Sequence, residues 1–253
     1  MARILAVANQ KGGVGKTTTA LNLGVALAQK QCRVLFVDLD PQASLTVFVG
    51  LDPYHVERST YSLLMHSNMM LTRVLQPLGS YLALLPGSVD LANAAIQLVQ
   101  GDYPLDRLRD TLRQGHVEFD YILVDTPPGL NVLTITGLIA ADEVLIPAQC
   151  NHSAILGIRA IQDVVQRVRS GMGNPSLEIA GILPTLYDAN AVYAPYILDE
   201  LHALLLGLVL NTIIPYDSNV ADAPHRGQVV VDYAPDSPAS LAYNALADEL
   251  LSR

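Results

Sequence analysis

A glycine-rich loop set between an apolar run and a helical pattern constrains the fold of this 253-residue chain. The loop, residues 11–18, reads KGGVGKTT and holds two of the chain's three lysines, Lys11 and Lys16. An apolar run over 3–8 precedes it, and residues 17–29 carry apolar side chains at helical spacing. In a strand, loop and helix in this order, successive backbone N–H groups and the helix N-terminus point at one anion. The segment therefore predicts a cradle for a polyphosphate.

The loop also indicates which residues contact the phosphates and a metal. In the pattern G-x-x-x-x-G-K-[ST], the lysine reaches the β- and γ-phosphates and the hydroxyl residue ligates Mg²⁺. Lys16 and Thr17 occupy these two positions. The other residues of the predicted cradle are Gly12, Gly13, Val14, Gly15 and Thr18.

The loop departs from that pattern at its start. Gln10 stands where the pattern has its first glycine, and a second lysine, Lys11, lies at the mouth of the loop. Since Lys16 already serves the bound phosphates, Lys11 needs a separate explanation. The alternative is a solvated surface lysine, which is the usual state of a lone charge.

Three aspartates follow apolar runs that are expected to be strands. The carboxyl ends of parallel strands meet at one edge of a sheet, so Asp38, Asp40 and Asp125 should lie beside the glycine loop. An unpaired Asp125 carboxylate would be costly to bury, and Mg²⁺ would satisfy it. Asp38 and Asp40 flank Leu39, so an extended backbone sends both carboxylates to the same side. Alternatively, one of them caps a helix that starts near Pro41.

Apolar runs and helical patterns alternate along the chain. Strands are expected over 3–8, 33–38, 81–85, 121–125, 143–148, 178–184 and 209–214. Helices are expected over 17–29, 60–66, 89–99, 105–113, 130–140, 154–169, 192–206 and 238–251. Strand runs that are apolar on both faces suit a parallel sheet covered by helices. The pattern predicts an α/β fold with one doubly wound, mostly parallel, twisted sheet flanked by helices, in a single domain over 1–253.

These motifs together resemble one family of ATPases. The loop KGGVGKTT looks like the deviant Walker A motif of the ParA/MinD (Soj-like) family of P-loop ATPases. The segment VLFVDLDPQ at 34–42 is similar to the family's switch I, and YILVDTPP at 121–128 to its Walker B and switch II. Residues 213–215 and 223–224 resemble its C-terminal nucleotide-contacting region. The resemblance covers nearly the whole chain.

The resemblance implies a cofactor, a partner and residue roles. It implies ATP with Mg²⁺ and a homodimer that sandwiches ATP, in which Lys11 crosses to the nucleotide of the partner subunit. Asp40 is then expected to position the attacking water, and Asp38 to help hold the hydration shell of the metal. Thr185, Pro215 and Asp217 are expected near the adenine, although Thr185 and Asp217 are equally compatible with a helix cap or a turn.

Charge leaves two functional alternatives open. The net charge of −9 opposes general attraction to nucleic acid, which is carried by clustered Lys and Arg. ParA proteins nonetheless bind nucleoid DNA as ATP dimers, and a dimer could align scattered arginines. The candidate DNA contacts are Arg159, Arg167, Arg169, Arg226 and Arg253. A second arginine group, which is an alternative for the same role, is Arg107, Arg109 and Arg113.

The leading hypothesis is therefore a weak ATPase that partitions DNA or positions another large cargo, activated by a ParB-like partner. The alternative is a MinD-like regulator that binds membrane or protein without DNA. The C-terminal stretch 241–251 has an apolar face but two acids and no lysine, whereas an interfacial anchor wants a cationic face.

Cysteine use and the N-terminus bear on the compartment. The two cysteines, Cys32 and Cys150, lie far apart and lack the spacing of a metal site, so a reducing compartment is the default. The first strand pattern begins at the N-terminus and leaves no room for a signal peptide. We expect a cytoplasmic protein that associates with the nucleoid.

Overall fold

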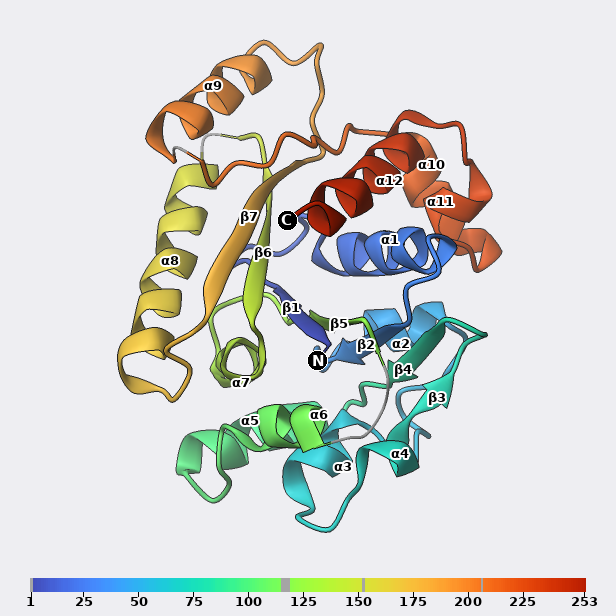
Figure 1. Cartoon of the computed structure of the whole chain (residues 1–253), viewed down its shortest axis with the longest axis vertical. Coiled ribbons are helices and arrows are strands. Elements are labelled where there is room, and N and C mark those ends of the chain that lie inside the picture. The colour runs from blue at the N-terminus through green and yellow to red at the C-terminus, as the bar shows by residue number, and fades with distance from the viewer. Residues whose placement is uncertain (1, 115–118, 152, 206) are drawn as a thin grey trace.

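A computed structural model describes residues 2–114, 119–151, 153–205 and 207–253, and within them seven strands form one sheet (Figure 1). The strands are β1 (Arg3–Val7), β2 (Val34–Asp38), β3 (Gln76–Pro77), β4 (Leu82–Leu85), β5 (Tyr121–Asp125), β6 (Glu143–Gln149) and β7 (Glu178–Thr185). Their order is β3-β4-β2-β5-β1-β6-β7, and every neighbouring pair is parallel except β3 and β4. The predicted doubly wound sheet is confirmed.

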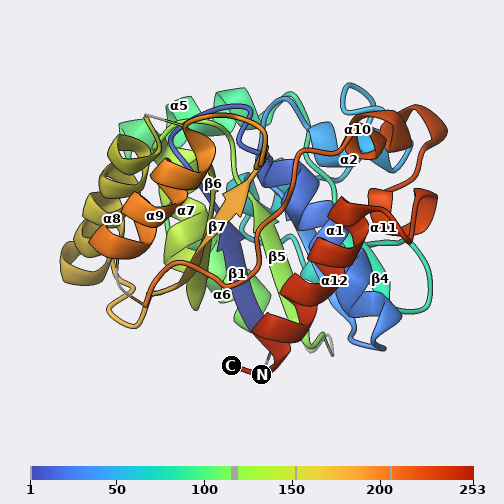
Figure 2. The same ribbon diagram turned by 90° about the horizontal axis from the view of Figure 1, so that it is seen from above.

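Helices cover both faces of the sheet (Figures 1 and 2). One face carries α1 (Lys16–Gln29), α2 (Ser44–Phe48), α11 (Val230–Tyr233) and α12 (Pro238–Leu251). The other carries α3 (Thr60–Met65), α5 (Leu91–Gln100), α6 (Arg107–Gln114), α7 (Val132–Ala140) and α8 (Ala154–Gly171). The remaining helices are α4 (Leu71–Val74), α9 (Ala194–Leu204), α10 (Ser218–Asp222) and the 3₁₀ helix η1 (Ala223–Arg226).

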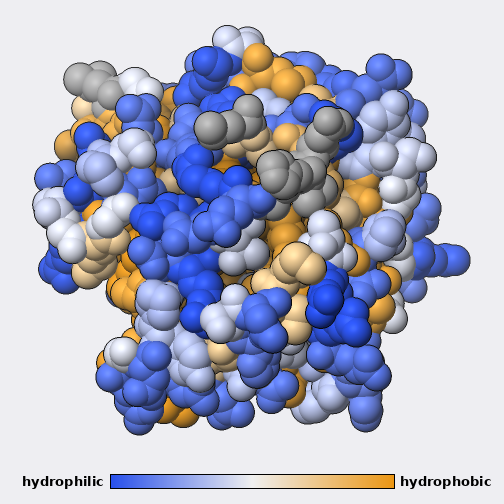
Figure 3. Space-filling view, turned by 60° about the horizontal axis from the view of Figure 1, so that its bottom comes forward, coloured by the Kyte–Doolittle hydropathy of each residue, from blue (hydrophilic) through white to orange (hydrophobic). Residues whose placement is uncertain are grey.

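Each face of the sheet has its own apolar core. Strands β2 and β5 are buried at every residue, as strands covered on both faces must be. The helices turn their polar faces outward, and the face shown in Figure 3 is mostly hydrophilic, with hydrophobic side chains in small groups. Helix α12 packs on α1 through Tyr243, Leu246 and Leu250. None of the described helices combines the length and the apolar character that a membrane span requires.

The predicted strand over 209–214 is wrong. Beside β7, the chain forms two isolated bridges here, from Val209 to Ile182 and from Pro215 to Tyr187. Between them, the carboxylate of Glu249 in α12 accepts from the backbone N–H groups of Asn211 (3.0 Å) and Thr212 (2.9 Å). Because these donors are bound by a side chain, they do not enter a ladder with β7.

The structure also contains short elements that the apolar patterns did not predict. These are β3, α2, α4, α10, η1 and α11, each of five residues or fewer. The short helices complete about one turn each, and β3 has two residues, so none of them is long enough to show a periodic pattern of apolar residues. The predicted helix over 192–206 is α9, and its last predicted residue lies outside the described residues.

Gly24 is the point of closest approach between α1 and the sheet, which yields a prediction about stability. A Cβ atom at this position would overlap the ring of Phe36, which is buried in β2. Alanine normally favours a helix by about 1 kcal/mol over glycine. Overpacking a core costs about 1–3 kcal/mol, and here a buried ring would have to move. We expect Gly24→Ala to lower the free energy of unfolding, measured by urea titration.

The matched control is Gly171→Ala, at the last residue of α8. A Cβ atom there would meet nothing within 4 Å. The control should leave stability unchanged or raise it slightly. Equal stability of the two variants would contradict the packing of α1 on Phe36.

Candidate functional site

The glycine loop lies at the carboxyl edge of the sheet, between β1 and α1. Gly13 and Gly15 have φ angles of 73° and 85°, which lie in the left-handed region that favours glycine. A Cβ atom at Gly13 would meet nothing within 4 Å, so this side of the loop is open. The loop is tied to the segment after β5, because the backbone N–H of Gly129 donates to Gln10 O at 2.9 Å. This is the predicted cradle.

Lys16 is folded over the loop and is 7% exposed. Its Nζ donates to the carbonyl oxygen of Lys11 at 3.1 Å. Burial lowers the pKa of Lys16, and the charges of Asp125 and Asp40 oppose that effect. A largely buried cation facing two carboxylates is suited to neutralise an anion that enters the cradle.

Asp125 is a fully buried carboxylate. It ends β5 with no exposed surface, and within the described residues neither of its side-chain oxygens has a hydrogen-bond partner. Burial raises the pKa of Asp125 well above its usual value, and the Asp38 charge adds to this, while the nearby Thr17 hydroxyl and the Lys16 charge lower it. Two unsatisfied oxygens beside a lysine and a hydroxyl fit a site for a cation such as Mg²⁺.

Asp38 lies next to Asp125 but has partners of its own. The two residues are paired in the register of β2 and β5. Asp38 accepts from the backbone N–H of Asp40 (3.1 Å) and from the N–H and hydroxyl of Thr46 (3.0 and 2.7 Å). Burial raises the pKa of Asp38 to about 6 despite these bonds. Asp38 thus anchors the segment 40–46, while its role toward a metal stays a prediction.

Asp40 lies at the start of that anchored segment. It is 8% exposed, and its Oδ1 accepts from the backbone N–H of Gln42 at 2.9 Å. The negative charge of Asp40 raises the pKa of Lys16 and the pKa of Asp125. The structure therefore brings together Lys16, Asp38, Asp40 and Asp125, as the strand-end pattern predicts. Within the described ranges, no group of three His, Cys, Asp or Glu residues forms a metal site by itself.

A pocket of about 300 Å³ adjoins the cradle and contains the predicted adenine contacts. Thr185, Pro215 and Asp217 line it together with Gly13, Gly15 and Thr18. The Thr185 hydroxyl donates to Val14 O at 2.9 Å and so holds the loop. Tyr216 and the buried Tyr243 also line the pocket, and the sequence patterns did not single them out.

Asp217 is engaged as a cap. Its Oδ1 accepts from the backbone N–H of Asn219 at 2.9 Å, at the start of α10, and its Oδ2 accepts from that of Ala239 at 3.1 Å, in α12. The cap interpretation of Asp217 therefore describes the structure, and its contact with a base stays a prediction.

Lys11 contacts residues outside its own loop. Its Nζ donates to the side chains of Asn151 (3.4 Å) and Ser153, in the connection between β6 and α8. Its backbone N–H is held by Asn9, whose amide also donates to Pro147 O at 2.7 Å. Polar residues scattered at 9, 151 and 153 share no sequence pattern, so their convergence on Lys11 is visible only in the fold.

The candidate DNA-contacting arginines are not gathered in one subunit. Arg159, Arg167 and Arg169 lie exposed on α8, while Arg226 belongs to η1 beyond the opposite face of the sheet (Figure 1). Arg253 follows α12, where it bonds Ala180 O and Glu249.

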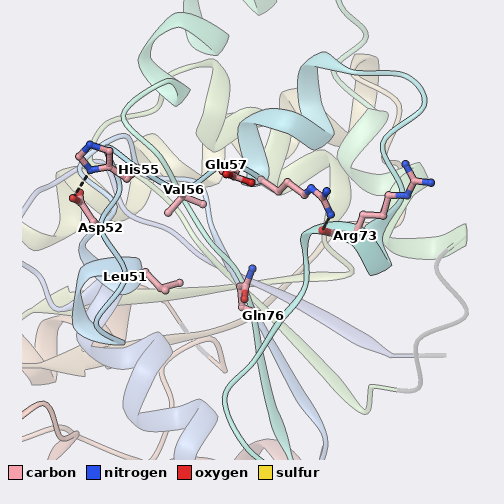
Figure 4. Close-up of a pocket in the computed structure, with 8 residues that line it drawn as sticks. Leu51, Asp52, His55, Val56, Glu57, Arg73 and Gln76 are labelled. Carbon is pink, nitrogen blue, oxygen red and sulfur yellow. Dashed lines mark hydrogen bonds and ion pairs between the residues drawn. The ribbon is translucent and has the colours of Figure 1, made fainter.

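A separate cavity of about 480 Å³ lies around residues 51–58, beside Arg73 and Gln76 (Figure 4). Its lining includes a hydrogen bond between the His55 ring and the Asp52 carboxylate at 2.7 Å, and the Arg73 guanidinium points away from it. It contains no residue of the glycine loop and none of the strand-end aspartates. The candidate site is therefore the cradle and its adjoining pocket.

Known proteins of similar sequence and structure bear on this site. Residues 2–179 match a family model described as an AAA domain. The chromosome-partitioning ATPase Soj of Thermus thermophilus is 39% identical over 251 residues, covering 99% of this chain and 96% of the relative. The chromosome partitioning protein ParA of Myxococcus xanthus is 37% identical over 252 residues, covering 99% and 88%.

A solved structure is similar to this chain over almost its whole length. It is described as cobyrinic acid a,c-diamide synthase from Mycobacterium smegmatis with bound ATP analog and magnesium. It is 35% identical, has a TM-score of 0.84, and is matched over 99% of this chain and 95% of that one. Matches that span almost the whole chain, together with a cradle, strand-end aspartates and sheet order in the expected places, show that the chain belongs to the ParA/MinD family of P-loop ATPases.

Proposed function

We propose that this chain is an ATP-dependent dimerisation switch and weak ATPase that partitions DNA or positions a large intracellular cargo. The observation that carries the proposal is the orphaned Asp125 carboxylate beside Lys16 and Thr17, at the open side of the glycine loop. Similarity to partition ATPases supports the biological role, and the magnesium and ATP analog bound by the Mycobacterium smegmatis protein support the ligands.

Each residue of the site has a role in this proposal. The loop N–H groups and Lys16 hold the β- and γ-phosphates, and Thr17 and Asp125, with Asp38, face the metal. Mg²⁺ supplies neutralisation of the phosphate charge when it is bound. Asp40 orients the attacking water, and Lys11 of each subunit reaches the triphosphate of the other. The pocket lined by Thr185, Pro215 and Asp217 receives the adenine.

The switch follows from contacts that exist in one state alone. The γ-phosphate and Lys11 interact in the closed dimer and not in the separate subunit, so ATP favours closure and hydrolysis reverses it. The closed dimer binds DNA without sequence specificity in the cytoplasm, and a ParB-like partner stimulates hydrolysis. The second candidate is a MinD-like regulator that binds membrane or protein. The net charge of −9 opposes general attraction to DNA and so keeps a regulator without DNA binding as an alternative.

Lys11→Ala separates binding from turnover. Nucleotide affinity should change little, because Lys16 and the loop hold the phosphates of their own subunit. Turnover should fall at least tenfold, since an arginine finger in a comparable position is worth about 10³–10⁵ in rate. Nucleotide titration and phosphate release measure the two quantities. Lys30→Ala, which removes an ion pair with Asp248, is the matched control and should retain turnover. Unchanged turnover in Lys11→Ala would make Lys11 an ordinary surface lysine.

Asp40→Ala should trap the dimer. Without the carboxylate that orients water, bound ATP persists and the closed state accumulates. Size-exclusion chromatography with ATP should then show a dimer that the wild type forms transiently. Asp52→Ala, in an exposed loop, serves as the control. Hydrolysis at the wild-type rate in Asp40→Ala would remove Asp40 from this role.

DNA binding distinguishes the two candidate functions. We expect binding to non-specific duplex DNA with ATP and not with ADP, with an affinity that falls as salt is raised. Arg159→Ala and Arg167→Ala should weaken it and reduce the salt slope by about one for each lost phosphate contact. Arg109→Ala is the control, because Arg109 is paired with Asp106 and Asp110. Recruitment to anionic liposomes without DNA binding would favour the second candidate.

A further inference from the structure

The side chain of Lys11 is docked on its own subunit. Its Nζ donates to Asn151 Oδ1 at 3.4 Å and to Ser153 Oγ. Its stem lies over α8, where a Cβ atom at Gly157 would be 3.7 Å from Lys11 Cε. Two acceptors and a close helix surface therefore place the ammonium group beside Asn151 and Ser153, next to the start of α8.

The acceptors are arranged for this contact. Ser153 is the N-cap residue of α8, yet its side chain makes no cap hydrogen bond to the helix. Its hydroxyl instead donates to Asn151 Oδ1 at 3.0 Å. The Asn151 amide is oriented by a bond from its Nδ2 to Gln149 Oε1 at 3.1 Å, which leaves Oδ1 toward Ser153 and Lys11. The Ser153 hydroxyl thus contacts Lys11 and does not make the usual N-cap hydrogen bond to the helix backbone.

The docked position is held by neutral groups alone among the described residues. No carboxylate pairs with Lys11, and partial burial lowers the pKa of its amine. A contact between an ammonium group and neutral oxygens is weaker than one with a carboxylate, so a triphosphate of a second subunit can displace it. The docked lysine cannot serve that triphosphate at the same time.

We infer that Asn151 and Ser153 are positioning residues that hold Lys11 in cis in the separate subunit, and that this contact competes with the trans contact and weakens the ATP dimer. The inference rests on the proposed function, because it presupposes that Lys11 acts across a dimer. A contact made in one state alone shifts the equilibrium by its own strength. Two docked lysines are released when a dimer forms, so the free energy of dimerisation includes the loss of this contact twice.

The test measures the dissociation constant of the dimer with a non-hydrolysable ATP analogue by analytical ultracentrifugation. Asn151→Ala and Ser153→Ala should each lower this constant about tenfold, because the lost contact stabilises the separate subunit. Asn151→Asp should raise it, because a carboxylate holds the ammonium more tightly. Ser170→Ala, at the other end of α8, is the control and should change nothing. Effects of opposite sign from two substitutions at one position exclude general damage to the fold.

A second readout follows the lysine itself. The chain has three lysines, so isotope-labelled lysine gives three resolvable side-chain signals by NMR. Without nucleotide, the Lys11 signal should change in Ser153→Ala while the Lys30 signal stays. A changed Lys11 signal with an unchanged dimer constant would overturn the competition, and a weaker dimer in both alanine variants would overturn it too. A wild type that stays monomeric with the analogue would instead refute the proposed function.

Discussion

Asp38 and Asp125 are register partners at the ends of neighbouring parallel strands, and neither is exposed. Two buried carboxylates in register are unfavourable unless each charge is compensated. Asp38 is compensated by three hydrogen bonds from Asp40 and Thr46. Asp125 has none from the described residues, so its compensation must come from the cradle side, where Lys16 and Thr17 lie. Because Asp38 is compensated and Asp125 is not, the two strand ends are suited to bind a cation at Asp125 together with an anion in the cradle.

The bonds that compensate Asp38 also organise the segment that carries Asp40. Thr46 donates its hydroxyl to Asp38 and accepts from the backbone N–H of Gly87 at 2.7 Å. Gly87 must be glycine, because a Cβ atom there would lie 2.9 Å from Asp38 Cγ. The end of β2, the segment 40–46 and the loop after β4 are therefore joined through one carboxylate. A change of charge near Asp125 would therefore alter the electrostatic interaction with Asp38, and through the hydrogen bonds of Asp38 it would affect the segment that holds Asp40.

The sequence was sufficient where one local pattern decides the structure. The cradle follows from glycines that take left-handed angles, and β2 and β5 follow from runs that are apolar on both faces. Residues 209–214 have the same apolar character, but Glu249 from a distant helix binds their N–H groups, and no local pattern contains that contact. For Asp217, the local pattern allows the helix cap that the structure shows at Asn219, but it does not contain the second contact, in which the Ala239 N–H donates to Asp217 Oδ2. Long-range polar contacts were what the sequence could not predict.

The two lysines of the loop illustrate the same division. Lys16 is the first residue of α1, so the helix and the loop fix its direction over the phosphate site, and the motif alone predicts it. Lys11 lies before the glycines, and its direction depends on Asn9, Asn151 and Ser153. Two cations in one loop are thereby held by different parts of the fold. Lys16, next to the phosphate site of its own subunit, is fixed by the start of α1. Lys11, which we propose contacts the partner subunit, is held by neutral groups that can release it.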